Sequence, residues 1–422
     1  MPVFGCVADD FTGAGDAASF LVQGGMSVQL FCGIPAEGSR IAEGVQAVVI
    51  ALKSRTQETD DAVKDTVEAL RWLKEKGVRQ FYLKYCSTFD STPKGNIGPI
   101  ADAAMEFLEV SCTILCPALP VNGRVVRHGE LYVGGVPLQE SPMKNHPLTP
   151  MWDSSVARLM MPQSRYSCVE LWKEQLDQDG ADIWKELAER SSGAEHYYII
   201  PDYQDQADGE RIAELFGGLK LLTGGSGLLE PLARRLSTQQ QGGQALDIRA
   251  AGAAILLAGS CSKATLGQIA YFQSHGGFSY KIDPAALLDG SERVGNAWDF
   301  VMAHEGAPVL VYSSDTAEHV KESQRLGQSR IADMLEQAAA ELAERAVEHG
   351  IRRVIVAGGE TSGAVTKRLR FSSYRIGKSV APGVPVMIPL ENPDIRLVLK
   401  SGNFGQEDFF ERVLKMTEME ED

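Results

Sequence analysis

The chain has 422 residues, of which 44% are hydrophobic and 23% charged, a composition typical of globular proteins. Its formal net charge of −15 argues against a nucleic-acid or anionic-membrane partner, because such binding depends on Lys and Arg that neutralise phosphates. No apolar run approaches the roughly 18 residues that cross a bilayer, and the N-terminus lacks the basic segment of a secretory signal. The seven Cys residues include no CxxC pair, so we expect buried reduced thiols in a cytoplasmic protein.

Short apolar runs alternate with amphipathic stretches along the first half of the chain. The stretch 59–77, for example, carries Leu, Val and Trp at the three- and four-residue spacings of a helix. Buried strands rich in β-branched residues that alternate with helices indicate an α/β fold with largely parallel sheets. The runs that we expect to form strands are 3–9, 27–32, 47–52, 80–85, 112–119, 196–202 and 219–224.

Residues 237–252 interrupt this alternation, since they are rich in Gln and Gly and have no apolar period. We interpret them as a connection between two α/β domains, residues 1–245 and residues 246–422. The alternation then restarts, with expected strands at 252–259, 308–315, 352–359 and 395–402.

Three expected strands of the second domain each run into a small polar loop and then into a helix. The glycines let the backbone approach an anion closely, and the helix N-termini offer unpaired N–H groups. Ligands of open α/β sheets bind at the carboxyl ends of strands, so three such loops predict an anion or nucleotide site. Neither a Walker loop nor a strand-anchored GxGxxG fingerprint is present. The loops are AGSCSKAT (258–265), AGGETSGA (357–364) and KSGNFGQEDFF (400–410).

The expected strands of the first domain also end in polar residues, which should meet at one edge of a parallel sheet. Cations suit a carboxylate, hydroxyl groups and amides suit sugar oxygens, and acids suit a catalytic base or a metal. The cluster therefore predicts a site for a polyhydroxy acid. Its members include Asp9, Asp10, Thr12, Asp16, Ser54, Arg55, Lys84, Ser87, Thr88, Asp90, Asn122 and Arg124.

Structural roles are open for several of these polar residues. Asp10 and Asp90 each fit the cap of a helix or turn as well as they fit a site. His128, which precedes a glycine, fits a turn better than a catalytic role. His146, which precedes a proline, fits either a ligand contact or a structural hydrogen bond.

The motifs resemble those of a known family when they are taken in chain order. ADDFTGAGD (8–16), LKSR, the KYCSTFDSTPKGNIG segment, NGR, NHPLTPMWDS, AGSCS, AGGETSGAV and LKSGNFG are similar to those of the four-carbon acid sugar kinases. The resemblance spans both expected domains. It is strongest to the subgroup that acts on 3-oxo-tetronate.

The resemblance implies a sugar-acid-binding N-terminal domain and an ATP-binding C-terminal domain, with the active site in the cleft between them. It implies a phosphotransferase with an alcohol group as acceptor, which uses ATP and Mg²⁺ to phosphorylate the 4-hydroxyl of 3-oxo-tetronate. Nucleotide contacts would then fall on Ser260, Gly358, Gly359, Glu360, Thr361, Ser401 and Gly402.

The resemblance also carries substrate contacts onto the first domain. We expect Asp10, or else Asp16, to accept the proton of the reacting hydroxyl, and we identify no metal ligands. The substrate contacts would fall on Asp9, Asp10, Arg55, Lys84, Ser87, Thr88 and Arg124, to which we add Ser54.

Other functions stay open at this point. A kinase of D-threonate or erythronate would differ by one or two side chains in the pocket. A non-catalytic sugar-acid sensor would need the first cluster but not the three glycine-rich loops. A dehydrogenase would need the dinucleotide fingerprint that is missing. We expect a sugar acid and ATP as small-molecule partners, and the sequence is compatible with a homo-oligomer.

Overall fold

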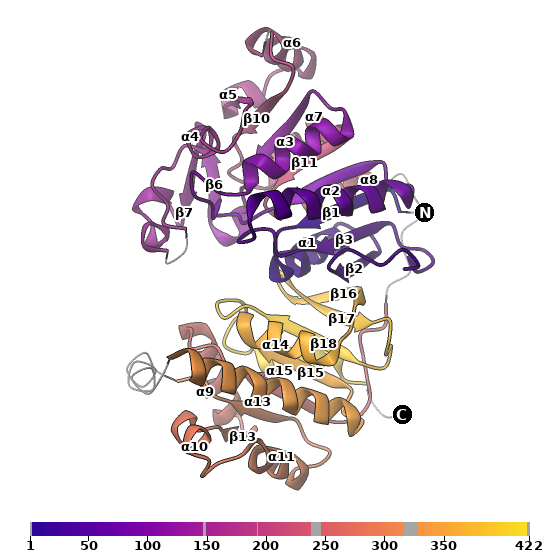
Figure 1. Ribbon diagram of the computed structural model, residues 1–422, viewed down its shortest axis with the longest axis vertical. Coiled ribbons are helices and arrows are strands. Elements are labelled where there is room, and N and C mark those ends of the chain that lie inside the picture. The colour runs from indigo at the N-terminus through magenta and orange to yellow at the C-terminus, as the bar shows by residue number, and fades with distance from the viewer. Residues whose placement is uncertain (1, 147–148, 192, 238–245, 316–327, 420–422) are drawn as a thin grey trace. The chain divides into compact units, whose positions relative to one another are not determined.

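A computed structural model describes residues 2–146, 149–191, 193–237, 246–315 and 328–419 (Figure 1). The chain divides into two compact units, Met1–Gln244 and Ala245–Asp422. Of the connection expected at 237–252, residues 238–245 lie outside the described residues, as does the expected boundary.

The first unit is built on a parallel sheet with the strand order β2-β3-β1-β4-β11-β5-β10-β9. All seven strands that the sequence predicts here are present, and β9 is a strand that it missed. The strands are β1 (Phe4–Ala8), β2 (Val28–Cys32), β3 (Ala47–Ala51), β4 (Gln80–Lys84), β5 (Cys112–Cys116), β9 (Ser167–Leu171), β10 (Tyr197–Pro201) and β11 (Leu221–Gly224).

Helices cover this sheet, and the longer ones bury side chains at helical spacing. In α2 (Thr59–Glu75), Ala62, Ala69 and Leu73 are buried at helical spacing, while acids occupy the first turn, where the helix dipole favours them. Helix α2 packs against α3 (Figure 1), and α1 packs against α8. The other helices are α1 (Phe11–Gln23), α3 (Ile97–Leu108), α4 (Val156–Met160), α5 (Lys173–Leu176), α6 (Gly180–Arg190), α7 (Gln206–Phe216) and α8 (Leu229–Ser237).

A small antiparallel sheet follows the fifth strand of the first unit. Its hairpin turns at His128 and Gly129, whose φ angles are 49° and 72°. Such left-handed angles at both central residues match a tight hairpin turn, so the turn predicted for His128 is confirmed. The elements are β6 (Arg124–Arg127), β7 (Glu130–Val133) and β8 (Val136–Pro137), with 3₁₀ turns η1 (Pro120–Asn122), η2 (Leu138–Glu140) and η3 (Pro142–Asn145).

The second unit has a mixed sheet with the order β13-β14-β12-β15-β18-β17-β16. The strands β13, β14, β12, β15 and β18 are parallel, while β17 and β16 add an antiparallel hairpin. The sequence predicted four of these strands and missed β13, β16 and β17. The strands are β12 (Ala254–Ala258), β13 (Phe278–Lys281), β14 (Val309–Tyr312), β15 (Arg353–Ala357), β16 (Ser373–Ala381), β17 (Val384–Pro389) and β18 (Arg396–Lys400).

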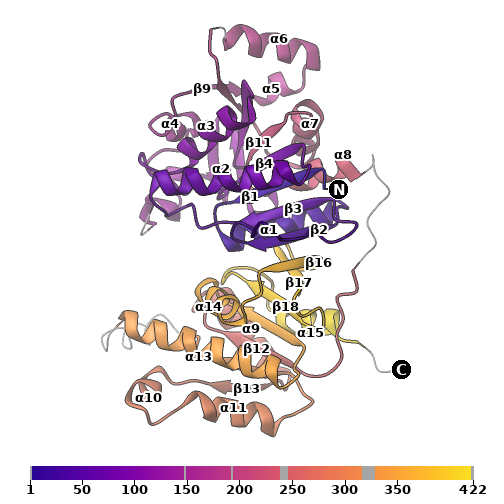
Figure 2. The same cartoon turned by 45° about the vertical axis from the view of Figure 1, so that its right-hand side comes forward.

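The core of the second unit joins the sheet to its covering helices. Leu256, Ile355 and Val398 from three strands pack with Phe409 and Phe410 of α15. Helix α13 packs against α14 (Figure 2), and every helix among the described residues is too short or too polar to cross a membrane. The helices are α9 (Lys263–Ser274), α10 (Pro284–Asp289), α11 (Val294–Ala303), α13 (Gln328–Glu348), α14 (Gly359–Leu369) and α15 (Phe409–Thr417).

Candidate functional site

Strand register brings the polar residues of the first unit to one edge of its sheet. Ala8 at the end of β1 pairs with Ala51 of β3 and with Lys84 of β4, and Lys84 pairs in turn with Gly224 of β11. Because these strands are parallel and end in register, the segments that follow them leave the sheet side by side. The convergence that the sequence predicts is therefore present.

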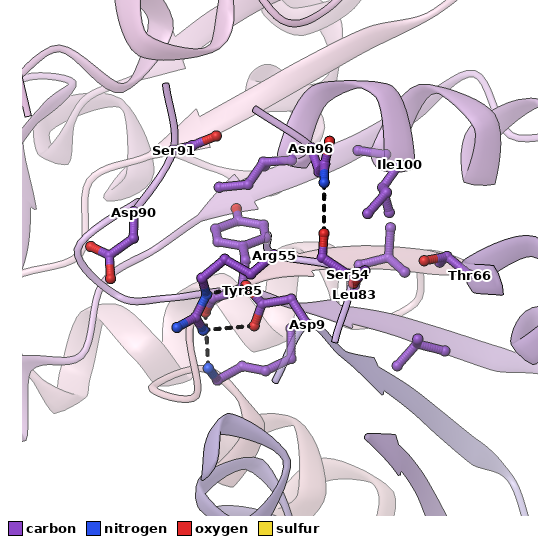
Figure 3. Close-up of a pocket in the computed structure, with 14 residues that line it drawn as sticks. Asp9, Ser54, Arg55, Thr66, Leu83, Tyr85, Asp90, Ser91, Asn96 and Ile100 are labelled. Carbon is purple, nitrogen blue, oxygen red and sulfur yellow. Dashed lines mark hydrogen bonds and ion pairs between the residues drawn. The ribbon is translucent and has the colours of Figure 1, made fainter. Parts of the chain in front are cut away.

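Arg55 links the two acids that follow the first strand. Its Nε donates to Asp9 Oδ2 at 2.7 Å, and its Nη2 donates to Asp9 Oδ1 at 2.8 Å (Figure 3). The same Nη2 donates to Asp10 Oδ1 at 3.0 Å. Burial raises the pKa of Asp9, and the Arg55 charge opposes that rise. The guanidinium is thus already balanced by two carboxylates, which it holds in fixed positions.

Asp10 is the N-cap of α1, one of the two roles that the sequence left open for it. Its Oδ1 accepts the N–H of Gly13 at 2.9 Å. A Cβ on Gly13 would lie 2.3 Å from that oxygen and 3.1 Å from Lys84 Nζ, so only glycine allows this close approach. The side chain of Asp10 is 33% exposed, which leaves it accessible from solvent.

Lys84 and Asp16 form a buried polar group beside this loop. Lys84 is only 5% exposed, and its ammonium donates to the carbonyl of Tyr85 at 2.9 Å. Asp16, 8% exposed, accepts the hydroxyl of Ser226 at Oδ2, while its buried Oδ1 accepts no hydrogen bond from the described residues. Burial raises the pKa of Asp16, and the field of Lys84 is the largest opposing influence.

A pocket opens at this edge and joins predicted residues to residues that the sequence did not single out as contacts (Figure 3). Asn96 donates from Nδ2 to the carbonyl of Ser54 at 2.7 Å and so holds the segment that presents Arg55. The polar residues that line the pocket are Asp9, Ser54, Arg55, Thr66, Lys84, Tyr85, Asp90, Ser91 and Asn96, beside aliphatic side chains that include Leu83 and Ile100.

Four predicted substrate residues do not line this pocket: Asp10, Ser87, Thr88 and Arg124. Thr88 is buried and donates to Asp90 Oδ1 at 2.6 Å, while the neighbouring Ser87 is half-buried. Arg124 lies on β6, where it donates to the carbonyl of Asn122 at 2.7 Å. Its charge nevertheless opposes the rise in the pKa of Asp16, so the guanidinium lies close enough to act on that buried acid.

His146 has a structural partner in the described part of the chain. The N–H of Thr149 donates to His146 Nδ1 at 3.1 Å, and the Thr149 hydroxyl lies 2.8 Å from the same nitrogen. The structure therefore gives His146 the structural hydrogen bond that the sequence allowed.

The three strand–loop–helix units that the sequence predicts in the second unit are present. Ala258 at the end of β12 pairs with Ala357 of β15, which pairs with Lys400 of β18, so the three loops start in register. Ser262 caps α9, and Gly358, with a φ of 139°, precedes α14.

Glycines bring these three loops into contact. A Cβ on Gly402 would lie 2.3 Å from Ser260 Oγ, and a Cβ on Gly259 would lie 2.3 Å from Thr361 Oγ1. Thr361 is buried, whereas Gly359 and Glu360 are exposed at the start of α14, and Ser401 is half-buried. The predicted nucleotide residues therefore form one connected surface made of three loops.

The cysteines and the acids offer no metal centre among the described residues. No group of three or more His, Cys, Asp or Glu in that part of the chain could hold an ion. All seven Cys residues are free thiols; Cys6, Cys112 and Cys116 are buried, but Cys261 is exposed, contrary to the general expectation of buried thiols.

Comparisons with known proteins agree with a sugar-binding first unit and a nucleotide-binding second unit. Residues 4–232 match the model of a sugar-binding N-terminal domain, and residues 255–410 match that of a nucleotide-binding C-terminal domain. The 3-oxo-tetronate kinase of Cupriavidus necator is 43% identical, covering 98% of this chain and 97% of its own length. That of Haemophilus influenzae is 40% identical, covering 97% and 98%.

Solved structures extend the similarity to the fold. A Salmonella typhimurium LT2 crystal structure matches with a TM-score of 0.91 and 39% identity over 98% of this chain and 99% of the other. A Haemophilus influenzae crystal structure matches with a TM-score of 0.85 and 39% identity over the same shares, 98% and 99%. The motifs, the two domain matches and these full-length relatives together establish that the chain belongs to the four-carbon acid sugar kinase family.

Proposed function

We propose that the chain is an ATP-dependent kinase that phosphorylates the 4-hydroxyl of 3-oxo-tetronate. The substrate oxygen would bond to the γ-phosphorus, the bond from that phosphorus to the β,γ-bridging oxygen would break, and ADP would leave. The observation that carries this proposal is identity of about 40% over nearly the full length to several 3-oxo-tetronate kinases.

The polar pocket of the first unit supports a sugar-acid substrate. Arg55 is already bound to two carboxylates, whereas the Lys84 ammonium donates to a backbone carbonyl. We therefore assign the substrate carboxylate to the field of Lys84. The side chains of Asp90, Ser91 and Asn96 would meet the hydroxyl and keto oxygens of the substrate.

Of the two acids considered as the proton acceptor, Asp10 is the better placed. Its carboxylate is 33% exposed and is held at a helix N-terminus, so a substrate hydroxyl can reach it. Asp16 is buried and bound to Ser226, so a substrate hydroxyl has less access to it. Proton acceptance by a positioned carboxylate suits phosphoryl transfer, which otherwise needs mainly positioning and charge stabilisation.

Mg²⁺ fits this chain as a partner of the nucleotide phosphates. The described residues contain no cluster of acids that would hold it alone, and Mg²⁺ in phosphoryl-transfer sites binds substrate phosphates and keeps several waters. When bound with ATP it neutralises charge that develops on the phosphates. The residues of this chain would position the nucleotide, chiefly through the loops at Ser260, Gly358 and Gly402.

ADP release with Mg-ATP across a panel of sugar acids tests the proposed function. We expect turnover on 3-oxo-tetronate to exceed turnover on D- and L-threonate and on D- and L-erythronate. Preferred turnover of threonate or erythronate would keep the kinase and replace the substrate. If the protein binds a sugar acid but releases no ADP with any of the five, it is a sensor and the proposed function is wrong.

Gly402→Ala is expected to raise the KM for ATP by about 10-fold or more. The new methyl group would lie 2.3 Å from Ser260 Oγ, which is too close, so the Ser260 hydroxyl would have to move. The KM for the sugar acid should stay within about two-fold of the wild-type value. Steady-state kinetics with each substrate varied in turn measures both constants.

Gly363→Ala is the matched control for this prediction. Gly363 lies inside α14 and is exposed, with nothing within 4 Å of the added Cβ. That variant should bind ATP normally and unfold at a higher temperature, since Ala stabilises a helix interior by about 0.5–1 kcal/mol relative to Gly. Equal kinetic effects in the two variants would contradict the assignment of the 401–406 loop to the nucleotide.

A further inference from the structure

Lys400, the last residue of β18, is an ammonium group buried under the loop that follows it. Its side chain is 1% exposed. Its Nζ donates to Thr265 Oγ1 at 2.9 Å, to the carbonyl of Gly402 at 3.1 Å and to that of Ser401 at 3.4 Å. The ring of Phe409 lies 5.7 Å from the same nitrogen. Each of these acceptors is neutral.

The hydrogen bonds within the 401–406 loop give the Lys400 ammonium no negative partner. The carbonyl of Gly402 also accepts from Ser262 Oγ at 2.5 Å and from Thr265 Oγ1 at 3.0 Å. No ion pair is recorded between Lys400 and an acid of the described residues, and burial lowers the pKa of Lys400 to about 8. A buried cation is costly in free energy unless an anion balances it. The buried Lys400 ammonium therefore indicates that an anion binds nearby.

The peptide groups of the 401–406 loop indicate where an anion would bind. The carbonyls of Ser401 and Gly402 turn towards Lys400, and the C=O and N–H of a trans peptide point in opposite directions. The N–H groups of Gly402 and Asn403 therefore point away from the ammonium. Neither takes part in a backbone hydrogen bond among the described residues.

Gln268 of α9 repeats this arrangement further along the loop. Its Nε2 lies within hydrogen-bond distance of the carbonyls of Phe404 at 3.0 Å, Gly405 at 3.1 Å and Gln406 at 3.0 Å. The side chain is fully buried. Lys400 and Gln268 thus turn the carbonyl oxygens of five of the six residues 401–406 inward, all but that of Asn403. Such an arrangement presents amides outward, as anion-binding loops do.

We propose that Lys400 is a positioning residue for the nucleotide, which orients the amides of the 401–406 loop towards a phosphate and supplies the charge that this phosphate balances. The inference rests on the proposed function only in that the anion is a nucleotide phosphate. Lys400 itself is too buried to touch the ligand, so it acts through the loop and through its field.

Lys400→Met and Lys415→Met form the first pair of test variants. Lys415 is an exposed lysine on α15 of the same unit. Lys400→Met should weaken binding of Mg-ADP by about 10–100-fold in calorimetry, as loss of a charge-assisted interaction does. Its melting temperature should stay equal to the wild-type value or rise, because Met removes a buried charge without a counter-ion. Lys415→Met should leave both quantities unchanged.

Thr265→Val and Thr265→Ser test the contact between Lys400 and the loop with little change in volume. Val removes the oxygen that accepts from Lys400 and donates to Gly402, whereas Ser keeps it. We expect Thr265→Val to raise the KM for ATP several-fold and to leave kcat and the KM for the sugar acid unchanged. Thr265→Ser should have a KM for ATP close to that of the wild-type protein.

The affinity of the wild-type protein for Mg-ADP should also fall as the pH rises through about 8, and this step should be missing in Lys400→Met. The groups that face the ammonium from α9, the loop and α15 are a hydroxyl, two carbonyls and a ring, so none of them titrates in this range. Burial is the cause of the lowered pKa, and the charge is present below that pH and lost above it.

Three results would overturn the proposal. They are unchanged Mg-ADP affinity in Lys400→Met, affinity and melting temperature falling together, and a wild-type protein that binds no nucleotide. Because binding is measured without turnover, a wild-type protein that binds Mg-ADP but phosphorylates none of the sugar acids would refute the proposed function alone, and the Lys400 comparison would still decide this inference.

Discussion

Replacement of Asp10 by Asn is expected to lower kcat by about 10²–10⁴-fold, the usual contribution of a positioned proton acceptor. Asn keeps the shape of the side chain and its Oδ1, which accepts the N–H of Gly13 at 2.9 Å and caps α1. Asn and Asp are about equally good N-caps, so the substitution removes the proton acceptor and leaves the cap in place. The melting temperature should therefore change little.

Turnover of 3-oxo-tetronate with saturating Mg-ATP measures the effect of Asp10→Asn. The matched control is Asp61→Asn, an exposed acid in the first turn of α2, which should keep full activity. Asp10→Ala should lose the same turnover and, in addition, about 1 kcal/mol of unfolding free energy with the cap. Full turnover in Asp10→Asn would show that Asp10 is not the proton acceptor, and Asp16 would then be the remaining candidate.

Replacement of Lys84 by Met is expected to lower the free energy of unfolding by about 3 kcal/mol at pH 8, because it leaves the buried Asp16 without the cation that acts on it most strongly. This is the lower end of the effect of breaking a buried pair, since the ammonium donates to a backbone carbonyl and not directly to an acid. Burial raises the pKa values of Asp16 and Asp9, and the field of Lys84 opposes that rise in both acids.

The loss of stability in Lys84→Met should shrink as the pH falls. Without the ammonium, the folded-state pKa of Asp16 rises further above its ordinary value of 3.8. The folded state then binds more protons than the unfolded state between those two pKa values, so stability increases as the pH falls through that range. Denaturant unfolding at pH 5 and pH 8 measures the difference between the variant and the wild type.

Lys64→Met, which alters an exposed lysine of α2, is the matched control for Lys84→Met. It should unfold like the wild-type protein at both pH values. A Lys84→Met protein with wild-type stability at pH 8 would mean that the two acids are neutral in the native state. The field of Lys84 would then not be what keeps Asp16 charged.

Local patterns in the sequence were sufficient for most of the α/β framework. Buried strands such as Phe4–Ala8 and Ala47–Ala51 are continuous apolar runs, and helices such as α2 carry a clear apolar stripe. Glycine after a strand predicted the loops at Gly259 and Gly402, because close backbone contact requires the missing Cβ. Both kinds of signal depend only on neighbours in the chain.

The missed strands have weaker or mixed patterns. The short β13 is half-exposed at the edge of its sheet, and its four residues include Ser and Lys. The β16–β17 hairpin surrounds Pro382 and Gly383, a turn signal that could have revealed it. Its antiparallel pairing makes the second sheet mixed.

The tertiary structure alone decided which polar residues meet. Ser226 binds Asp16 across 210 positions of sequence because β11 is inserted between β4 and β5, and no local pattern encodes that strand order. The burial of Lys400 was equally invisible, since a lysine at the end of a strand is normally exposed. The sequence by itself determined most of the strands, the three loops of the second unit and the family, because these depend on short-range patterns and motifs. The partners of each charge depend on long-range strand pairing, which only the folded chain establishes.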